Sequence, residues 1–393
     1  MFDLANVARQ AGNQVWTFSP RYYQRIGEVN YPELANHFNF GTYFENMVHL
    51  RLSELTGLHG YFSYFGTKEL LRKLDEIKPD IIHLHNLHNC SIDIPLLFKY
   101  IKNINIRTVW TLHDCWSFTG KCPHFTIVKC ERWRTGCYKC PQLRQYPRAF
   151  TDRTKMMWRK KRAWFTGVND MTLVTPSEWL ANLAKQSFLH NYNISVINNG
   201  IDLSVFRYTT KETAMLEKFD NKRFKLLGVA DVWSDRKGLD VFIRLSKELP
   251  KEEYQIILVG TNERVDKLLP DNITSIHHTQ NQEELALIYS SVDLLVNPTR
   301  EEVFGLVNVE ALACGTPVLT FATGGCTEIV DDTCGIAVKC DDVEGLESSI
   351  RKIAKERPFS KEACIKHAKK YDKNSKYQEY IKLYNDVYTR KQL

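Results

Sequence analysis

The chain has 393 residues, of which 43% are hydrophobic and 25% charged, with 19 Gly and 13 Pro. This composition excludes a disordered chain, a collagen-like repeat and a small disulfide-stapled scaffold, and the length predicts two or three globular domains. The formal net charge is +7, and residues 101–162 hold 15 Lys and Arg against 3 Asp and Glu, which indicates either an anionic partner or a solvated basic surface.

Residues 1–10 lack the basic and apolar stretches of a signal peptide and are typical of a helix. No apolar run approaches the roughly 18 residues that cross a bilayer. We therefore expect a cytoplasmic protein, in which the 11 cysteines are reduced thiols or metal ligands rather than disulfides.

The first half of the chain alternates short apolar segments with longer helical ones. Continuous apolar strands separated by helices indicate a buried parallel sheet covered on both faces, so this half predicts one doubly wound domain. We expect strands at residues 13–19, 80–85, 107–112, 172–175 and 194–197, and helices at 67–77, 94–101, 153–165 and from Ser177.

Five cysteines lie within 26 residues between the expected strand at 107–112 and the expected helix at 153–165. The spacing Cys137-x-x-Cys140 is typical of a zinc knuckle, and Cys122 with Cys130 would complete a tetrahedral site. A structural zinc ion is one interpretation, and reduced packing thiols or a redox pair are the others. A bound zinc ion would pin this insertion and take no part in catalysis.

The expected helix at 153–165 combines five Lys and Arg after residue 154 with Met and aromatic side chains. A basic helix with an apolar side suits the surface of an anionic bilayer. A helix packed inside its domain with a basic outer face explains the same pattern. Both interpretations stay open on the sequence.

The alternation restarts after a turn-rich connection at residues 198–206. The second half therefore predicts another doubly wound domain, and because ligands bind beyond the carboxyl ends of such strands, a cleft between the domains is the default active site. We expect strands at 225–230, 254–260, 273–277, 292–298 and 317–321, helices at 239–249, 282–290 and from Phe304, and only helices after residue 321.

Residues 299–328 (TREEVFGLVNVEALACGTPVLTFATGGCTE) carry the most specific pattern. Glu302 follows an expected strand, and a helix begins near Gly305, where free N–H groups suit an anion such as diphosphate. Glu310 lies among apolar neighbours, where a carboxylate needs either the hydroxyls of a sugar or ribose or a structural arginine. A second glycine turn, Gly324–Gly325, presents further N–H groups or simply joins a strand to a helix.

Arg236 and Lys237 follow the expected strand at 225–230. Two adjacent cations at the carboxyl end of a strand can neutralise a diphosphate leaving group, although such a pair is often only a surface feature. Because they lie in the same domain as Glu302, the functional interpretation is favoured.

Together these residues resemble retaining glycosyltransferase family 4, which has the two-domain GT-B fold, and in particular its bacterial exopolysaccharide and colanic-acid-type members. The resemblance covers about residues 5–390 and is most specific at 302–310 (EVFGLVNVE), 311–317 (ALACGTP) and the Gly324–Gly325 turn. It implies three parts: an acceptor-binding Rossmann-like domain at 1–198 with a Cys-rich insertion at about 115–145, a nucleotide-sugar-binding domain at 199–372, and a helix at 373–393 that crosses back to the first domain.

The resemblance also implies roles for individual residues. Glu302 would contact the donor sugar, Glu310 the ribose hydroxyls, and the cations the diphosphate. His113, in 110–114 (WTLHD), matches the active-site His-Asp pair of the family, and a helix-capping pair is the alternative. The implied catalytic residues are His113 and Glu302, and the implied donor-binding residues are Arg236, Lys237, Phe304, Gly305, Leu306, Glu310, Gly324 and Gly325.

Two departures from the family pattern stand out. Members normally begin with a strand and a Gly-rich loop, whereas Met1 falls where their first helix starts, so we expect the first strand of the N-terminal sheet to be missing. Either the start is misassigned or truncated, or the enzyme is impaired. Many members carry a phosphate-binding basic residue where this chain has Asp231, and Arg236 beside Lys237 would substitute for it.

The implied chemistry requires stabilisation of the departing diphosphate and of an oxocarbenium-like sugar. The cations and helix N-termini meet the first need, so no cofactor is required for catalysis and zinc would be structural. The resemblance implies a UDP- or GDP-sugar donor and a saccharide acceptor, attacked on the same face so that the anomeric configuration is retained. With a membrane-binding helix, the acceptor would be lipid-linked and the enzyme peripheral on the inner face of the plasma membrane.

Two other functions remain open on the sequence. A zinc-containing nucleic-acid-binding protein would use the basic, Cys-rich segment, but it leaves Glu302 and Glu310 unexplained, so we expect no nucleic-acid partner. A GT-B-shaped isomerase or inactive homologue is consistent with the missing strand. His83, His85 and His88 are expected to be hydrogen-bonded residues at the end of a strand rather than a metal site.

Overall fold

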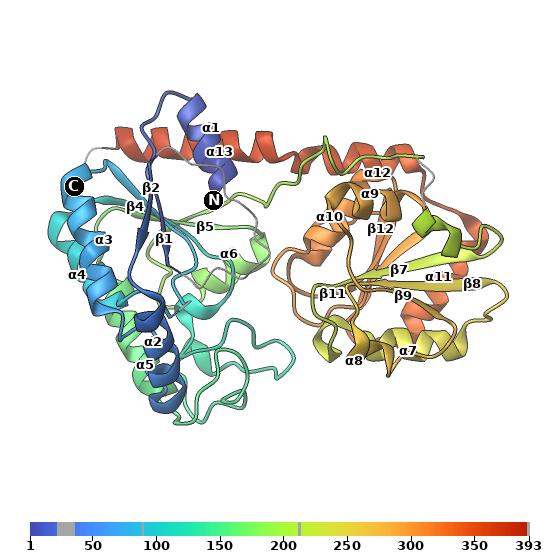
Figure 1. Cartoon of the computed structure of the whole chain (residues 1–393), viewed down its shortest axis with the longest axis horizontal. Helices are drawn as coiled ribbons and strands as arrows, with labels where there is room; N and C mark the ends of the chain where they lie inside the picture. Colours follow the sequence, from blue (N-terminus) through green and yellow to red (C-terminus); the bar gives the residue numbers. More distant parts are fainter. Residues whose placement is uncertain (22–35, 89, 211–213, 391–393) are drawn as a thin grey trace. The chain divides into compact units, whose positions relative to one another are not determined.

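The computed structural model describes residues 1–21, 36–88, 90–210 and 214–390. The chain divides into two compact units (Figure 1), which we call unit 1 (Met1–Ile197 with Tyr377–Leu393) and unit 2 (Asn198–Lys376). Each unit contains a parallel sheet with helices packed against it, as the alternating pattern predicts.

Unit 1 contains a four-stranded parallel sheet in the order β3-β4-β5-β6 and a separate parallel pair, β1-β2. The first described element is a helix, and the pair β1-β2 brings together two segments of which only the first was expected as a strand. The strands are β1 (Thr17–Pro20), β2 (His37–Phe40), β3 (Ile81–Leu84), β4 (Arg107–Thr111), β5 (Met171–Thr175) and β6 (Asn193–Val196). The helices are α1 (Phe2–Gln10), α2 (Tyr43–Thr56), α3 (Tyr64–Ile77), α4 (Ile94–Ile104), α5 (Thr154–Phe165) and α6 (Glu178–Lys185).

Both faces of the four-stranded sheet are buried, and β4 shows how its residues alternate between them. Val109 packs with Leu4 of α1 and with the last helix, α13 (Lys373–Thr389), through Leu383. Trp110 faces the other way and packs against Phe165 of α5, with ring centroids 4.8 Å apart. Figure 1 shows α1 and the unit 1 part of α13 running along the same side of the sheet. This double coverage explains why the strands are apolar on both sides.

Helix α5 directs its apolar side into unit 1. Met157, Trp158 and Phe165 are buried, and the Trp158 indole donates to the backbone carbonyl of Trp133 at 2.8 Å. The packed-helix interpretation therefore describes α5, and the membrane-binding interpretation of its apolar side is wrong, because those side chains already form the core of the unit.

Unit 2 contains a six-stranded parallel sheet in the order β12-β11-β10-β7-β8-β9. The strands are β7 (Phe224–Val229), β8 (Tyr254–Val259), β9 (Ile273–Ile276), β10 (Leu294–Asn297), β11 (Val318–Ala322) and β12 (Gly335–Lys339). The α-helices are α7 (Leu239–Glu248), α8 (Glu263–Asp266), α9 (Gln282–Ser290), α10 (Leu306–Ala313), α11 (Val343–Glu356) and α12 (Lys361–Ala368). Short 3-10 turns, η4 (Asp235–Lys237) and η5 (Gly324–Glu328), follow β7 and β11.

The prediction of helices alone after residue 321 is wrong at β12. Residues Gly335–Lys339 pair in parallel with β11, and Gly335 lies so close to the Val318 carbonyl oxygen that a Cβ atom would stand 2.3 Å from it. The strand is short and half-exposed, so its own sequence gives little signal. Its pairing with β11 decides its conformation.

Two apolar clusters cover the two faces of the unit 2 sheet. Leu227 and Leu295 pack with α9, α10 and α12, whereas Leu226 and Leu294 pack with α7 and α11. Consecutive residues of one strand thus enter different clusters, as expected for strands buried on both faces. The helices of these two layers lie above and below the sheet in Figure 1.

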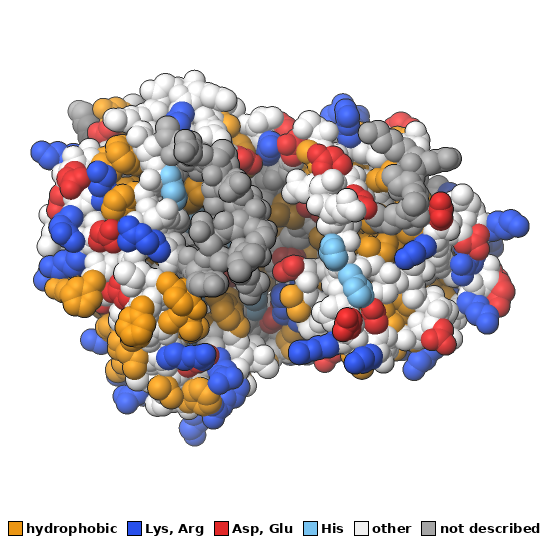
Figure 2. Space-filling model, viewed as in Figure 1, with side chains coloured by type: hydrophobic (Ala, Val, Ile, Leu, Met, Phe, Trp, Pro, Cys, Tyr) orange, Lys and Arg blue, Asp and Glu red, His pale blue; other side chains and the backbone are white. Residues whose placement is uncertain are grey.

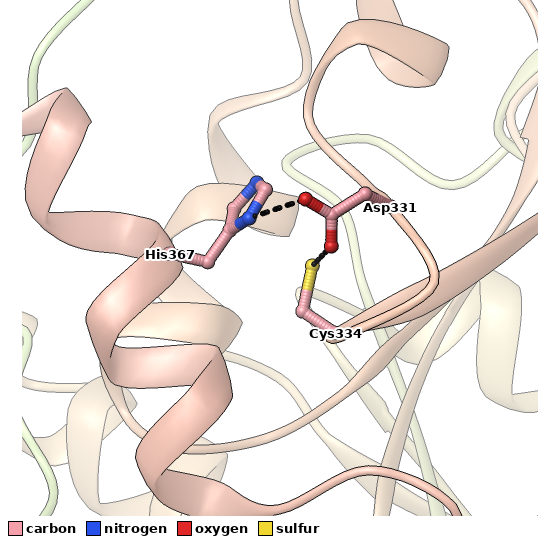
Figure 3. A group of neighbouring side chains, drawn as sticks. All are labelled: Asp331, Cys334 and His367. Carbon is pink, nitrogen blue, oxygen red and sulfur yellow. Dashed lines mark hydrogen bonds and ion pairs between the residues drawn. The ribbon is translucent and has the colours of Figure 1, made fainter.

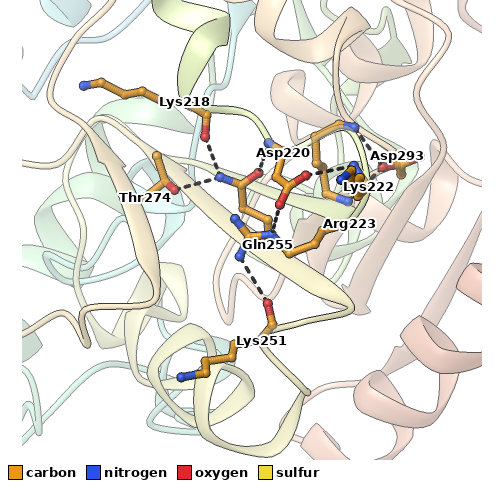
Figure 4. A network of polar contacts seen from close by, with 9 residues as sticks. Lys218, Asp220, Lys222, Arg223, Lys251, Gln255, Thr274 and Asp293 are labelled. Atoms are coloured by element: carbon orange, nitrogen blue, oxygen red, sulfur yellow. Dashed lines mark hydrogen bonds and ion pairs between the residues drawn. The ribbon is translucent and has the colours of Figure 1, made fainter.

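A polar network closes the amino-terminal edge of the same sheet (Figure 4). The buried Gln255 amide donates to the Lys218 carbonyl at 2.7 Å and to Thr274 Oγ1 at 3.0 Å, and its oxygen accepts from Asp220 N–H at 2.8 Å. Arg223 donates to the Asp220 carboxylate at 2.8 Å. Because these groups satisfy one another, this edge is structural, and the candidate site lies at the opposite, carboxyl edge.

Candidate functional site

The carboxyl ends of β7, β10 and β11 bring the predicted donor-site segments of unit 2 together. These strands are neighbours in the sheet, with β10 in the middle. Lys237 follows β7, Glu302 follows β10 and Gly324 follows β11. Parallel strands end at the same edge, so segments up to 87 residues apart in sequence meet there.

Lys237 and Glu302 form an ion pair at this edge. Lys237 Nζ donates to Glu302 Oε2 at 2.7 Å, and each side chain is 22% exposed. The other carboxylate oxygen, Oε1, accepts from the Val303 N–H at 3.1 Å. A half-buried pair of this kind holds both charges in fixed positions while leaving them open to a polar ligand.

Arg236 lies beside this pair. Its guanidinium donates to the Glu301 carbonyl at 3.5 Å, and its own carbonyl accepts from the Arg300 N–H at 2.9 Å. The exposed Asp231 lies at the start of the same loop. Because position 231 holds an acidic residue, Arg236 is the second basic residue at this edge, next to Lys237.

Arg300 fixes the loop that carries Glu302. Its guanidinium binds both oxygens of Asp240 at 2.7 Å and Asp341 Oδ1 at 2.5 Å, and its carbonyl accepts from Thr323 Oγ1 at 3.0 Å. The two-pronged pairing with a carboxylate restrains orientation as well as distance. The loops after β7, β10, β11 and β12 are thereby tied to one another.

Two glycines allow the backbone to approach closely at this edge. Gly324 has a φ of 53°, and a Cβ atom on it would stand 1.6 Å from the Glu302 carbonyl oxygen. Gly305 has a φ of 97° and precedes α10 without any side chain that caps its first turn. The N–H groups of that turn are the kind that bind phosphate oxygens. Phe304 is buried, so only its backbone can face a ligand, whereas Leu306 is partly exposed.

Gly325 is buried within η5, which begins directly after β11. Gly324 and Gly325 thus belong to a 3-10 turn of five residues that ends at Glu328, where the sequence predicted a glycine turn followed by a helix. Cys326 of this turn lies 3.1 Å from the position of a Cβ atom on Gly305. The two glycine turns therefore pack against each other.

Glu310 projects from α10, where Tyr289 is its partner. The Tyr289 hydroxyl donates to Glu310 Oε2 at 3.0 Å. Burial raises the pKa of Glu310 to about 7, and the Tyr289 hydrogen bond opposes the shift. Within the described residues no arginine pairs with this carboxylate, so the structural-arginine alternative does not account for it. A partly buried carboxylate with one occupied oxygen can still accept hydrogen bonds from hydroxyl groups.

His113 lies in unit 1, just beyond the end of β4. Its Nε2 atom stands 3.1 Å from Nδ1 of His85, and the two rings are stacked. Burial lowers the pKa of His113, and Asp114 partly opposes the shift. Asp114 itself accepts from the Trp116 N–H at 2.8 Å and contacts His88 at 3.4 Å. His113 is therefore a neutral, half-buried imidazole that can exchange hydrogen bonds with a hydroxyl group.

The neighbouring histidines belong to the sheet. His83 contacts the Tyr384 hydroxyl at 2.7 Å and Thr111 Oγ1 at 2.8 Å. Burial lowers the pKa of His83 to about 3 and that of His85 well below its ordinary value. These contacts explain two of the three histidines as hydrogen-bonded residues at the end of β3.

Two of the insertion cysteines are in contact. Cys122 Sγ and Cys140 Sγ lie 3.6 Å apart as free thiols, and Cys137 Sγ accepts from the Gly120 N–H at 3.1 Å.

One group of metal-ligating residue types was not expected from the sequence. Asp331, Cys334 and His367 of unit 2 lie within 4.8 Å of one another (Figure 3). His367 Nδ1 pairs with Asp331 at 3.0 Å, and its Nε2 faces the Ile329 carbonyl at 2.7 Å. Both ring nitrogens of His367 therefore already have oxygen partners within the protein. This group ties α12 to the loop before β12.

Sequence reasoning missed several residues that support the site. Tyr289 and His85 are the partners of Glu310 and His113, and Asn308, buried in α10, accepts from Asn297 at 2.8 Å. Each pair joins different elements, so no spacing pattern reveals it. The one available signal was the position of Tyr289 in the last turn of the helix that precedes β10.

Comparison with known families covers both units. The family model described as Glycosyltransferase Family 4 matches residues 1–205, and the one described as Glycosyl transferases group 1 matches residues 211–376. WcaC of Escherichia coli (strain K12), a protein named for glycosyl transfer in colanic acid biosynthesis, is 26% identical over 328 residues, which cover 81% of this chain and 78% of WcaC. In the described residues, no helix combines the length and apolarity that a membrane crossing requires.

Solved structures share the fold. Sucrose-phosphate synthase from Thermosynechococcus elongatus matches with a TM-score of 0.72 at 16% identity, over 98% of this chain and 92% of its own. Anabaena HepE, solved in complex with UDP, matches with a TM-score of 0.61 at 15% identity, over 81% and 82% of the two chains. Since the first family model spans more than half of the 393 residues, the chain belongs to Glycosyltransferase Family 4 and is a glycosyltransferase with the GT-B fold.

Proposed function

We propose that this glycosyltransferase moves a hexose-type sugar from a UDP- or GDP-sugar to a saccharide acceptor in polysaccharide biosynthesis, with retention of the anomeric configuration. The observation that carries the proposal is the Lys237–Glu302 ion pair at the carboxyl edge of unit 2, next to the glycine turns at Gly305 and Gly324. The UDP-glucose complex of HepE and the name of WcaC support the same donor class and pathway type.

In this proposal the donor lies along the carboxyl edge. Lys237, Arg236 and the N–H groups after Gly305 and Gly324 bind the diphosphate. Glu302 accepts hydrogen bonds from hydroxyls of the donor sugar, and Glu310 accepts them from the ribose. All of these groups come from loops that Arg300 ties together, so they are in place before the reaction, as electrostatic stabilisation of a leaving group requires.

Transfer breaks the bond between the anomeric carbon and the phosphate oxygen and forms a bond to the acceptor oxygen on the same face of the sugar. The acceptor hydroxyl proton passes to the departing diphosphate. The cations stabilise the charge that develops on that diphosphate. His113, neutral and half-buried in unit 1, orients a reacting hydroxyl through a hydrogen bond.

The test is release of UDP or GDP by the purified full chain from a panel of nucleotide sugars with saccharide acceptors. We expect one base to be preferred and Glu302→Gln to lower the rate by roughly a hundredfold or more. Glu356→Gln, at the exposed end of α11, is the matched control and should keep the full rate. Release that is unchanged in Glu302→Gln would remove this carboxylate from the mechanism.

The nucleotide is identified most directly by thermal unfolding. A ligand at about a hundred times its Kd stabilises the folded state by about 2.7 kcal/mol. UDP and GDP are compared at equal concentrations, and one of them should raise the Tm. If neither UDP nor GDP raised the Tm, the result would contradict a nucleotide-sugar donor.

The acceptor is proposed to be lipid-linked because unit 1 exposes an aromatic patch at the start of α2 and α3. Phe44 and Phe65 are 76% and 77% exposed, and Tyr43 and Tyr64 about half. Glu45 accepts from the Phe65 N–H at 2.8 Å, which holds the two helix ends together. In Figure 2 hydrophobic side chains gather beside Lys and Arg over the region of α2. Exposed apolar patches with basic neighbours suit an anionic bilayer surface.

Flotation with anionic vesicles at low salt tests the proposal of a lipid-linked acceptor. The full chain should float, and Phe44→Ser with Phe65→Ser should abolish flotation. Leu268→Ser, which alters a side chain of unit 2 that is 62% exposed, is the control and should float normally. A full chain that stays unbound rules out the lipid-linked acceptor and leaves the donor proposal untouched.

A further inference from the structure

The insertion of unit 1 between β4 and α5 has little regular structure to hold it. Within residues 112–153 the elements are two 3-10 turns, Trp116–Phe118 and Arg132–Arg134. Yet Trp116, Phe118 and Trp133 are fully buried in it. A segment of about forty residues without helices or strands is uncommon inside a compact domain, and a structural metal ion is one way to hold it in place.

Two sulfur atoms already stand at the spacing of a metal site. Cys122 Sγ and Cys140 Sγ are 3.6 Å apart and are not bonded to each other. Zinc–sulfur bonds of about 2.3 Å in a tetrahedron put sulfur atoms about 3.8 Å apart. The measured separation is close to this value and far above a disulfide bond of about 2.05 Å.

Cys137 is adjacent to this pair through Gly120. The Gly120 N–H donates to Cys137 Sγ at 3.1 Å, and a Cβ atom on Gly120 would stand 2.8 Å from Cys137 Cβ. The turn 120–122 therefore lies against the Cys137-x-x-Cys140 turn. Backbone N–H groups that donate to sulfur are expected where the sulfur is a thiolate ligand.

Cys130 is held near the same turn by Arg132. The Arg132 guanidinium donates to the Tyr138 carbonyl at 3.0 Å and also to the Lys139 carbonyl. Lys129 and Lys139, which precede Cys130 and Cys140, have φ angles of 47° and 43°. Each of these two cysteines thus follows a residue in the left-handed backbone conformation.

Two buried lysines in and beside the insertion also indicate a negative charge there. Lys121 is 2% exposed and Lys161 is not exposed at all. Lys121 Nζ donates to the carbonyls of Gln142 and Gln145 at 2.9 Å, and Lys161 Nζ to that of Trp116 at 2.7 Å. Among the described residues neither forms a salt bridge with a carboxylate. A negative charge nearby stabilises a buried cation. A zinc ion with four thiolates carries a net charge of −2 and would provide it.

We propose that Cys122, Cys130, Cys137 and Cys140 bind one structural zinc ion that staples the insertion, with Lys121 and Lys161 balancing its thiolates. Only the Cys122 and Cys140 sulfur atoms are in contact, and no three of the four lie within 4.8 Å of one another. Zinc binding draws Cys130 and Cys137 toward the Cys122–Cys140 pair. The fifth cysteine of the segment, Cys115, is fully buried and stays a packing residue.

The experiment measures zinc in the tag-free full chain after gel filtration in the presence of a chelator. We expect about one zinc ion per chain in the wild type and in Cys90→Ser, a control in the same unit outside the insertion. Cys140→Ser should hold less than about a tenth of an equivalent. Wild-type protein without zinc, or peptide mapping that finds a Cys122–Cys140 disulfide, would overturn the proposal.

A second measurement on the wild type covers the case in which Cys140→Ser fails to fold. Mercurial titration of the thiols should release the zinc as the insertion thiols react, and cobalt reconstitution should give the absorption of a tetrahedral cobalt–thiolate centre. Octahedral cobalt absorption would contradict four sulfur ligands. Release of UDP or GDP is measured separately, so this inference and the proposed function fail independently.

Discussion

Glu310 offers the most sensitive test at the scale of a single residue. Its pKa of about 7 means that the carboxyl group takes up a proton near neutral pH, because burial disfavours the charge. Only the ionised form can accept hydrogen bonds at both oxygens. A nucleotide sugar should therefore bind more tightly as pH rises through about 7, and calorimetry with UDP-glucose or its GDP counterpart measures this. Glu310→Gln should bind weakly with no such rise, and an equal rise in both proteins would assign it to another group.

Lys237 gives a second residue-scale prediction. Its removal takes away a diphosphate ligand and leaves Glu302 without its partner at 2.7 Å. Charge-assisted hydrogen bonds contribute about 1.5–3 kcal/mol, so Lys237→Ala should weaken donor binding by roughly tenfold to a hundredfold. Lys247→Ala, at the end of α7, is the matched control. Equal donor affinities for the two variants would exclude Lys237 from the site.

At the scale of elements, the site depends on the close packing of the loops after β10 and β11. Gly324→Ala would place a methyl group 1.6 Å from the Glu302 carbonyl oxygen, so the loop has to move. Gly167 also has a positive φ, 74°, but nothing lies within 4 Å of its Cβ position. Urea unfolding should show a cost of about 1 kcal/mol for Gly167→Ala, from backbone strain alone, and a larger cost for Gly324→Ala. Gly324→Ala should also weaken donor binding, and identical behaviour of the two variants would contradict the packing argument.

Some of these elements could be predicted from the sequence, and others could not. The strands and helices with long apolar patterns, such as β8 and α7, follow from local periodicity. The strand β12 does not, because its conformation depends on hydrogen bonds to β11. Glu302 and Lys237 were recognisable from their positions after strands, and Glu310 as a carboxylate among apolar neighbours. Tyr289 and Arg300 act through contacts between elements that no local spacing encodes.

At the scale of the whole molecule, buried histidines make unit 1 sensitive to acid. Burial lowers the pKa of His59 and His83 to about 3 and that of His49 to about 4, from an ordinary 6.5. Below pH 6.5 the unfolded chain binds protons that the folded chain does not, so stability is full above pH 6.5 and is lost as pH falls toward 4. Each histidine contributes a slope of at most about 1.4 kcal/mol per pH unit.

Tryptophan fluorescence can follow this loss, because every tryptophan except Trp233 lies in unit 1. The urea midpoint of the fluorescence change should fall steeply between pH 6.5 and 4, and His59→Gln should reduce the slope. His278→Asn, at an exposed histidine of unit 2, should leave it unchanged. A midpoint that is flat over this range would mean that the buried histidines are protonated in the folded chain.

The central claim is that two carboxylates and two cations at the carboxyl edge of unit 2 bind an activated sugar. The most direct measurement is a crystal structure of the full chain with a nucleotide sugar. Sugar hydroxyls should lie within hydrogen-bond distance of Glu302, ribose hydroxyls at Glu310, and the diphosphate against Lys237, Arg236 and the N–H groups after Gly305. A nucleotide sugar bound away from both carboxylates would contradict the account.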